Sequence, residues 1–335
     1  MPSIGIIANP ASGKDIRRLV SYATTIDNLE KVNVVKRIVL AAQALGVDEI
    51  LFMPDSFQIG HTVIDDLSHE GKLTANCRVL DLPLSASSSD TTAAATLMER
   101  LGVHCAVVLG GDGTSRAAAK GVSTLPLLPV STGTNNVYPS MLEGTVAGMS
   151  AAAVALKANP LDCCIRDKRV EVAVNGEYAD MALIDAVVTD DIFIGSRAIW
   201  EIDKIRHIVV TRCHPASIGF SSIAGCREIV RDSDAWGLFL ALDNTGEATL
   251  APVAAGVLSK IYISQSGRLP VDTPHVLSMT QDGMVALDGE RELKVRRNDT
   301  LSFTITQNGP WRIQTGPALE QAARQGLFCP QRFNI

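Results

Sequence analysis

The chain of 335 residues lacks the features that mark several special classes of protein. No apolar run approaches the ~18–20 residues needed to span a bilayer, and no basic segment precedes the first apolar run at Ser3. We therefore expect neither a membrane anchor nor a signal peptide. There are 30 Lys and Arg against 36 Asp and Glu, so the formal net charge is −6. This balance excludes the general basic surface of a nucleic-acid-binding protein.

Paired cysteines are missing as well. The chain has seven cysteines, an odd number, and none of them form a Cys-x-x-Cys motif. Several, such as Cys105, lie in apolar runs, and the six histidines show no metal-ligand spacing. We therefore expect reduced, mostly buried thiols in a cytoplasmic protein, rather than a disulfide framework or a zinc site.

The first part of the chain alternates short apolar runs with helical patterns. This alternation predicts parallel crossovers and a doubly wound α/β domain over residues 1–158. At 46% apolar and 20% charged, the chain is ordinary for a globular protein large enough for two domains. Strands are expected at 4–8, 50–53, 78–80, 106–109 and 125–130, and helices at 29–45, 64–69, 89–98 and 115–120.

After about residue 160 the pattern changes to that of antiparallel strands. Residues 169–174 alternate in polarity and are followed by Asn175-Gly176, a strong type I′ hairpin signal. Further short strands are expected at 284–287, 293–295 and 301–305, with a helical insertion near 218–226. These features predict a β-rich domain over 159–314 and a closing segment, 315–335, with one short helix.

The stretch that organises the chain is Ala106–Leu109 followed by Gly110-Gly111-Asp112-Gly113-Thr114. It predicts a buried strand, a tight glycine turn and a helix capped by Thr114. Glycines let the backbone approach a ligand, and the N–H groups of a helix start favour phosphate. Asp112 would repel a bare phosphate, so it indicates a bound Mg²⁺ or a proton acceptor. The alternative is a tight turn with a solvated aspartate.

Two other strands of the predicted sheet end in polar turns. Asn9-Pro10 leads to Gly13-Lys14, where Asn9 and Lys14 are candidates for binding phosphate. Ser131–Asn136 offers Thr134 and Asn135 as hydroxyl and amide groups for phosphate, ribose or a base edge. Taken singly, either turn is explained by a surface loop. Because the carboxyl ends of parallel strands meet at one edge of a sheet, we expect the turns to line one crevice.

The loop before the third helix, residues 85–91, is expected to be an ordinary N-cap, with Ser89 or Asp90 as the capping residue. In the second half, Asp288-Gly289-Glu290 places two carboxylates around a glycine, although Asp-Gly is also a leading hairpin signal. Asp185 is a charge inside the apolar run 182–188. It requires a partner, a metal or a catalytic role, and a satisfied structural carboxylate is the alternative.

Together these motifs resemble the superfamily of NAD kinases, diacylglycerol kinases and sphingosine kinases, whose shared signature is the Gly-Gly-Asp-Gly turn. Asn9-Pro10 with Gly13-Lys14 is similar to the first nucleotide motif of the lipid kinases. Residues 133–136 are similar to their Gly-Thr-x-Asn-Asp loop, and residues 288–290 to their Asp-Gly-Glu motif. Within the superfamily the chain most resembles the ATP-NAD kinase-like proteins of the acetoin catabolism protein X family.

The resemblance implies an N-terminal α/β domain, a C-terminal β-sandwich-like domain, ATP between them, and a last segment that folds back onto the first domain. It also implies a homodimer or homotetramer. We expect an ATP- and Mg²⁺-dependent phosphotransferase that acts on a hydroxyl of a small soluble acceptor, in acetoin-type catabolism, with no membrane or nucleic-acid partner. The sequence does not identify the acceptor, and it does not decide between ATP and polyphosphate as donor.

In this hypothesis Asp112 is the general base, Glu290 and Asp185 are further catalytic candidates, and Asp288 and Glu290 hold Mg²⁺. Nucleotide binding is assigned to Asn9, Lys14, Gly110, Gly111, Gly113, Thr114, Thr134 and Asn135. The alternative function is a non-catalytic sensor that binds ATP or NAD. A Rossmann dehydrogenase is excluded, because no Gly-x-Gly-x-x-Gly turn follows the first strand.

Overall fold

The first half of the chain forms a parallel sheet, as the alternating pattern predicts. A computed structural model describes residues 1–13, 22, 24, 26–190 and 202–329, so Lys14 lies outside the described residues. The sheet has the strand order β3-β2-β1-β4-β5-β17-β6. Its five N-terminal strands are β1 (Ser3–Ala8), β2 (Glu49–Phe52), β3 (Asn76–Val79), β4 (Cys105–Gly110) and β5 (Leu127–Ser131).

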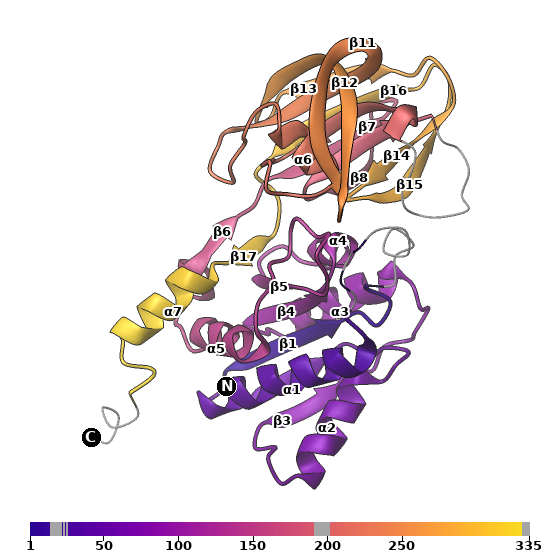
Figure 1. The fold of residues 1–335 in the computed structure, drawn as a ribbon. Helices are drawn as coiled ribbons and strands as arrows, with labels where there is room; N and C mark the ends of the chain where they lie inside the picture. Colours follow the sequence, from indigo (N-terminus) through magenta and orange to yellow (C-terminus); the bar gives the residue numbers. More distant parts are fainter. Residues whose placement is uncertain (14–21, 23, 25, 191–201, 330–335) are drawn as a thin grey trace.

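The last two strands of this sheet are the connections to the second half of the chain. β6 (Cys164–Arg166) leaves the sheet, and β17 (Trp311–Ile313) returns to it. β17 pairs in parallel with β5 and antiparallel with β6. Both connections therefore run side by side along one edge of the sheet, between the two halves of the molecule (Figure 1).

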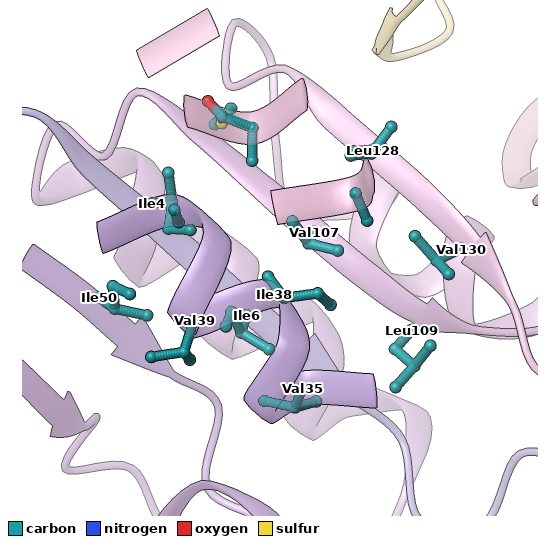
Figure 2. Packing of buried hydrophobic residues seen from close by; sticks show 14 of the residues in the cluster. Ile4, Ile6, Val35, Ile38, Val39, Ile50, Val107, Leu109, Leu128 and Val130 are labelled. Atoms are coloured by element: carbon teal, nitrogen blue, oxygen red, sulfur yellow. The ribbon is translucent and has the colours of Figure 1, made fainter. Parts of the chain in front are cut away.

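Helices cover both faces of the sheet, so the first half is doubly wound. One core contains side chains of α1 (Asn28–Ala44), α2 (Ile59–His69) and α5 (Gly144–Ala155), and the other those of α3 (Ser88–Arg100) and α4 (Asp112–Lys120). In Figure 2, Val35, Ile38 and Val39 of α1 lie over Ile6 and other strand residues. α1 begins where the Asp27 carboxylate accepts the N–H of Glu30 at 2.7 Å.

Two predicted helix caps are wrong. α3 is capped by Ser87, whose hydroxyl accepts the N–H of Ser89 at 3.2 Å, and not by Ser89 or Asp90. Asp90 instead accepts the N–H groups of Ser85 and Ala86 and fixes the loop before the helix. α4 has Gly111 as its N-cap, and Thr114 lies within the helix.

The second half forms two antiparallel sheets, as expected for a β-sandwich-like domain. The sheets have the orders β12-β11-β10-β9-β14-β15 and β13-β16-β7-β8. A core that includes Val172, Val188 and Phe303 draws residues from both. The strands are β7 (Arg169–Val174), β8 (Glu177–Ala182), β9 (Asp185–Thr189), β10 (Ile205–Val210), β11 (Trp236–Ala254), β12 (Val257–Pro270), β13 (Pro274–Ser278), β14 (Gly283–Leu287), β15 (Glu290–Val295) and β16 (Thr300–Thr306).

Two hairpins of this domain have the backbone of a type I′ turn. Asn175 and Gly176 have φ of 53° and 85°, and Asp288 and Gly289 have φ of 50° and 79°. Asp288-Gly289 thus joins β14 to β15 as a hairpin.

The remaining helices are short. They are η2 (Pro160–Cys163), η3 (Ile202–Lys204), α6 (Phe220–Gly225) and α7 (Thr315–Arg324). α7 returns to the first half, where Ala318 is buried in the core that contains α1 and α5. Within the described ranges, no helix combines the length and the apolar character needed to cross a membrane.

Candidate functional site

The turns that follow β1, β4 and β5 meet at the point where the sheet changes direction. β1 lies between β2 and β4, so the chain connections run to opposite sides of it, and ligands of open α/β sheets bind at such points. The N–H of Asn9 donates to the carbonyl of Leu109 at 3.1 Å, which ties the first turn to the end of β4. The N–H of Thr132 donates to the carbonyl of Gly110 at 3.2 Å, so the turns after β1 and β5 both contact the end of β4, as predicted.

A side-chain hydrogen bond joins the first turn to α4. The Asn9 amide donates from Nδ2 to the Thr114 hydroxyl at 2.9 Å, while its oxygen accepts the N–H of Ala11 at 2.9 Å. Thr114 also lies directly over Gly110: a Cβ at residue 110 would be 2.5 Å from the Cβ of Thr114. Glycine is therefore required at 110 for Thr114 to reach Asn9.

Asp112 holds the turn after β5. Its carboxylate accepts the N–H of Val137 at 3.0 and 3.1 Å and the N–H of Tyr138 at 2.7 Å. Beside it, Oδ1 of Asn136 would be 2.9 Å from a Cβ placed on Gly111. The glycine turn thus lets the segment 136–138 pack against the start of α4.

Thr134 and Asn135 lie on the same turn. The exposed Thr134 accepts the N–H of Thr24 at 3.3 Å. Oδ1 of Asn135 is buried and has no hydrogen-bond partner among the described residues. A buried acceptor of this kind is costly unless it is satisfied, so it suits a ligand that brings an N–H or O–H.

The second domain contributes Glu290, the first residue of β15. A Cβ on Gly113 would lie 2.5 Å from Oε1 of Glu290, so the glutamate packs directly onto the glycine turn. Its side chain remains 34% exposed and lies 4.0 Å from Nη2 of Arg116. A carboxylate from each domain, Asp112 and Glu290, therefore borders Gly113.

Arg116 forms a buried contact between the two domains. It extends from α4, is only 4% exposed and contacts carboxylates of the second domain. Its partners are Glu292, Asp180 at 3.3 Å and Asp288 at 3.7 Å. Within the predicted helix nothing in the sequence distinguished this arginine from a solvated one, so its role was not predicted.

Asp288 and Asp185 are buried behind Glu290 and Arg116. The Asp288 side chain is fully buried and accepts the N–H groups of Leu183 at 2.9 Å, Ile184 at 2.7 Å and Asp185 at 3.2 Å. Burial raises the pKa of Asp288, and Arg116 and these N–H groups oppose that shift. Asp288 thus fixes the turn that presents Glu290. Asp185 is buried at the start of β9.

The metal and catalytic roles assigned to Asp288, Asp185 and Glu290 stay predictions. Among the described residues no group of three or more His, Cys, Asp or Glu side chains could hold a metal ion. Mg²⁺ needs no such group when substrate phosphates and water complete its shell.

Lys31 stabilises the first turn of the site, and this role was not predicted from the sequence either. It is completely buried on α1, and its ammonium donates to the carbonyls of Asn9 at 2.9 Å, Pro10 at 3.2 Å and Ser12 at 2.7 Å. It fixes the shape of the first turn. The signal was present, because Lys31 falls on the apolar face of its helix, next to Val32 and one turn before Val35.

A cavity of about 330 Å³ opens beside the start of the turn after β5, on the face of the sheet covered by α1. Its volume falls in the range of small-molecule sites. Leu109 and Val130, at the ends of β4 and β5, line it together with Lys31, and Glu30 and Glu143 are among its charged residues.

Comparison with known proteins defines the class of this fold and site. Residues 4–156 match the family model of the ATP-NAD kinase N-terminal domain, and residues 168–308 match that of the acetoin catabolism protein X C-terminal domain. The chain thus has an NAD kinase-like fold. It is also 35% identical, over 338 aligned positions, to acetoin catabolism protein X of Cupriavidus necator, with 98% of this chain and 94% of that protein covered. The chain belongs to the acetoin catabolism protein X family.

Solved structures with a similar course of the chain include two kinds of kinase. Yeast NADH kinase, in complex with NADH, is 12% identical, with all of this chain and 88% of that chain covered and a TM-score of 0.49. A putative diacylglycerol kinase from Bacillus anthracis is 13% identical, with 93% and 96% covered and a TM-score of 0.46. The fold assignment depends on the strand order and the family match, and not on these two likenesses.

Proposed function

We propose that this protein is an ATP-dependent phosphotransferase that transfers a phosphoryl group to a hydroxyl of a small soluble acceptor, with a role in acetoin-type catabolism. The observation that carries the proposal is that three segments distant in sequence contact the Gly-Gly-Asp-Gly turn and the start of α4. Asn9 bonds to Thr114, Asn136 packs on Gly111, Asp112 holds residues 137–138, and Glu290 of the second domain packs on Gly113.

The residues present fit ATP and Mg²⁺. The turn at 110–114 opens a helix whose N–H groups and dipole favour phosphate, and the buried Oδ1 of Asn135 needs a donor such as a ribose hydroxyl or a base amine. Glu290 would bind Mg²⁺, which when present would neutralise charge on the phosphates. Asp288 would position Glu290 from behind.

Asn9 and Thr114, with Lys14 five residues after Asn9 in the sequence, would orient the phosphates. Asp112 would accept the proton of the acceptor hydroxyl as that oxygen forms its bond to phosphorus and ADP leaves. Positioning and charge neutralisation account for most of the catalysis in such transfers.

One observation favours the second candidate, a nucleotide sensor without turnover. The Asp112 carboxylate already accepts the N–H groups of Val137 and Tyr138, which is also the arrangement of a purely structural aspartate. A sensor would bind ATP or NAD but would not release ADP when an acceptor is added.

The test is a thermal-shift panel of ATP with Mg²⁺, polyphosphate, NAD(H) and small hydroxylated metabolites, followed by measurement of ADP release. A ligand at ~100 times its Kd raises the free energy of unfolding by about 2.7 kcal/mol. We expect ATP to bind and Asp112→Asn to lower turnover by ~10²–10⁴ with ATP binding retained. Asp65→Asn, on the exposed side of α2, is the matched control.

The outcomes separate the candidates. Normal turnover in folded Asp112→Asn would remove the aspartate from the chemistry. ATP binding without ADP release from any acceptor would favour the sensor, and no nucleotide binding at all would contradict both functions.

A further inference from the structure

The turn that Asp112 holds is also tied to the interdomain connections. Tyr138 is 3% exposed, and its hydroxyl donates to Oδ2 of Asp167 at 2.6 Å. Asp167 lies between β6 and β7, on the connection that leads out of the first sheet. One residue therefore contacts Asp112 through its backbone N–H and the outgoing connection through its side chain.

The returning connection meets the same carboxylate. Arg312 on β17 donates from Nε to Oδ2 of Asp167 at 2.8 Å and from Nη2 to Oδ1 at 3.0 Å. The backbones are paired here as well, since the N–H of Asp167 donates to Pro310 and that of Gly309 donates to Asp167. A two-pronged arginine–carboxylate pair is among the strongest and most directional hydrogen-bonded contacts.

The ring of Tyr138 is also contacted by an arginine of the second domain, Arg212, and by Arg312 of β17. The guanidiniums of Arg212 and Arg312 lie 5.0 and 5.9 Å from its ring centroid, and both arginines also bind Asp232. Burial beside Asp167 raises the pKa of Tyr138, so the phenol keeps its proton and remains a donor.

We propose that Tyr138 is a positioning residue that links the orientation of the two domains to the placement of Asp112. A shift of the paired connections moves Asp167, Asp167 moves Tyr138, and the N–H groups of residues 137 and 138 move with it on the Asp112 carboxylate. The catalytic consequence rests on the proposed phosphotransfer, whereas the mechanical link does not.

The test is amide hydrogen exchange of Val137 and Tyr138 in Tyr138→Phe, which removes one hydroxyl and keeps the ring and its arginine contacts. Loss of a hydrogen bond to a charged group should raise exchange at these two amides by roughly tenfold or more. The matched control is Thr211→Val, because Thr211 is equally buried and its hydroxyl donates to the carbonyl of Leu183 at 2.7 Å rather than to Asp167.

We expect both variants to lose comparable stability, with faster exchange at 137–138 in Tyr138→Phe only. Unchanged exchange in Tyr138→Phe, or equal acceleration in Thr211→Val, would overturn the link.

Where turnover is measurable, Tyr138→Phe should lower kcat by tenfold or more and leave the KM for ATP within about twofold, since the nucleotide contacts are intact. If no turnover is found, the exchange result still decides the proposal. Should Tyr138→Phe fail to fold, the same amides are followed in Arg312→Lys, which keeps the charge and weakens the two-pronged pair.

Discussion

Two half-buried histidines of the second domain have lowered pKa values. His207 on β10 and His275 on β13 each have one buried ring nitrogen without a hydrogen-bond partner in the described part of the chain, and His275 stacks on Phe239 at 4.3 Å. Burial lowers the pKa of both histidines. The pKa of His207 is lowered further by His275 and by Arg206, and Asp190 opposes this shift.

The sign of the pH effect follows from these shifts. The pKa values in the folded protein lie below the ordinary value of about 6.5, so the unfolded chain takes up protons first as the pH falls. Stability is then fully present above pH 6.5 and declines below it. We expect urea unfolding to show a smaller decline between pH 7.5 and 5.5 in His275→Phe than in the parent protein. His61→Gln, on the exposed side of α2, should keep the parent's decline, and an undiminished decline in His275→Phe would contradict the assignment.

The packing of α1 on α5 depends on two glycines one turn apart. A Cβ on Gly148 would lie 2.3 Å from the carbonyl oxygen of Ile38, and one on Gly144 would lie 2.7 Å from that of Val34. Ala at 148 must therefore push the helices apart, which disturbs the core that they share beneath the first turn.

We expect Gly148→Ala to lower the free energy of unfolding by about 1–3 kcal/mol, in spite of the better helix propensity of alanine. Gly316→Ala in α7 is the matched control, because nothing lies within 4 Å of its Cβ position. That variant should be neutral or up to about 1 kcal/mol more stable. Chemical denaturation measures both, and equal effects of the two substitutions would contradict the close helix contact.

Local signals explain which elements were predictable. The Asn175-Gly176 hairpin and the five parallel strands follow from adjacent residues, whose turn chemistry and apolar runs act at short range. The caps of α3 and α4 were predicted two or three residues late, because Ser87, Ser89 and Asp90 compete at one helix start and Asn9 takes the hydroxyl of Thr114 at the other. Which residue forms the cap depends on its hydrogen-bond partners, and the local sequence does not show which partner is preferred.

At the scale of the molecule, the motifs indicated which turns meet but not what joins the two halves. β17 enters the first sheet between β5 and β6, about 180 residues after the end of β5 and about 145 after the end of β6, and no local pattern specifies that pairing. The contacts of Tyr138 with Asp167 and of Arg116 with Asp180 also join residues that are distant in the sequence, by 29 and 64 positions. They could be found only once the strand order was known.

Arg116 offers the sharpest test of how the two halves hold together. Arg116→Met keeps much of the side-chain volume but leaves Glu292 and the buried Asp288 without their guanidinium, while Asp180 retains Lys120. Removing one partner of a buried ion pair destabilises by about 3–5 kcal/mol. Burial already raises the pKa of Asp288, and loss of Arg116 raises it further, so the folded variant takes up a proton more readily than the unfolded chain.

The loss of stability in Arg116→Met should therefore be greatest near pH 8 and partly relieved near pH 5. Arg78→Met is the control, since Arg78 pairs with Glu49 on the surface and such pairs contribute about 0–1 kcal/mol. Guanidinium denaturation of both variants at the two pH values makes the comparison. If the free energy of unfolding falls no more in Arg116→Met than in Arg78→Met, and the loss is independent of pH, the domains are held by their apolar contacts and the paired connections alone.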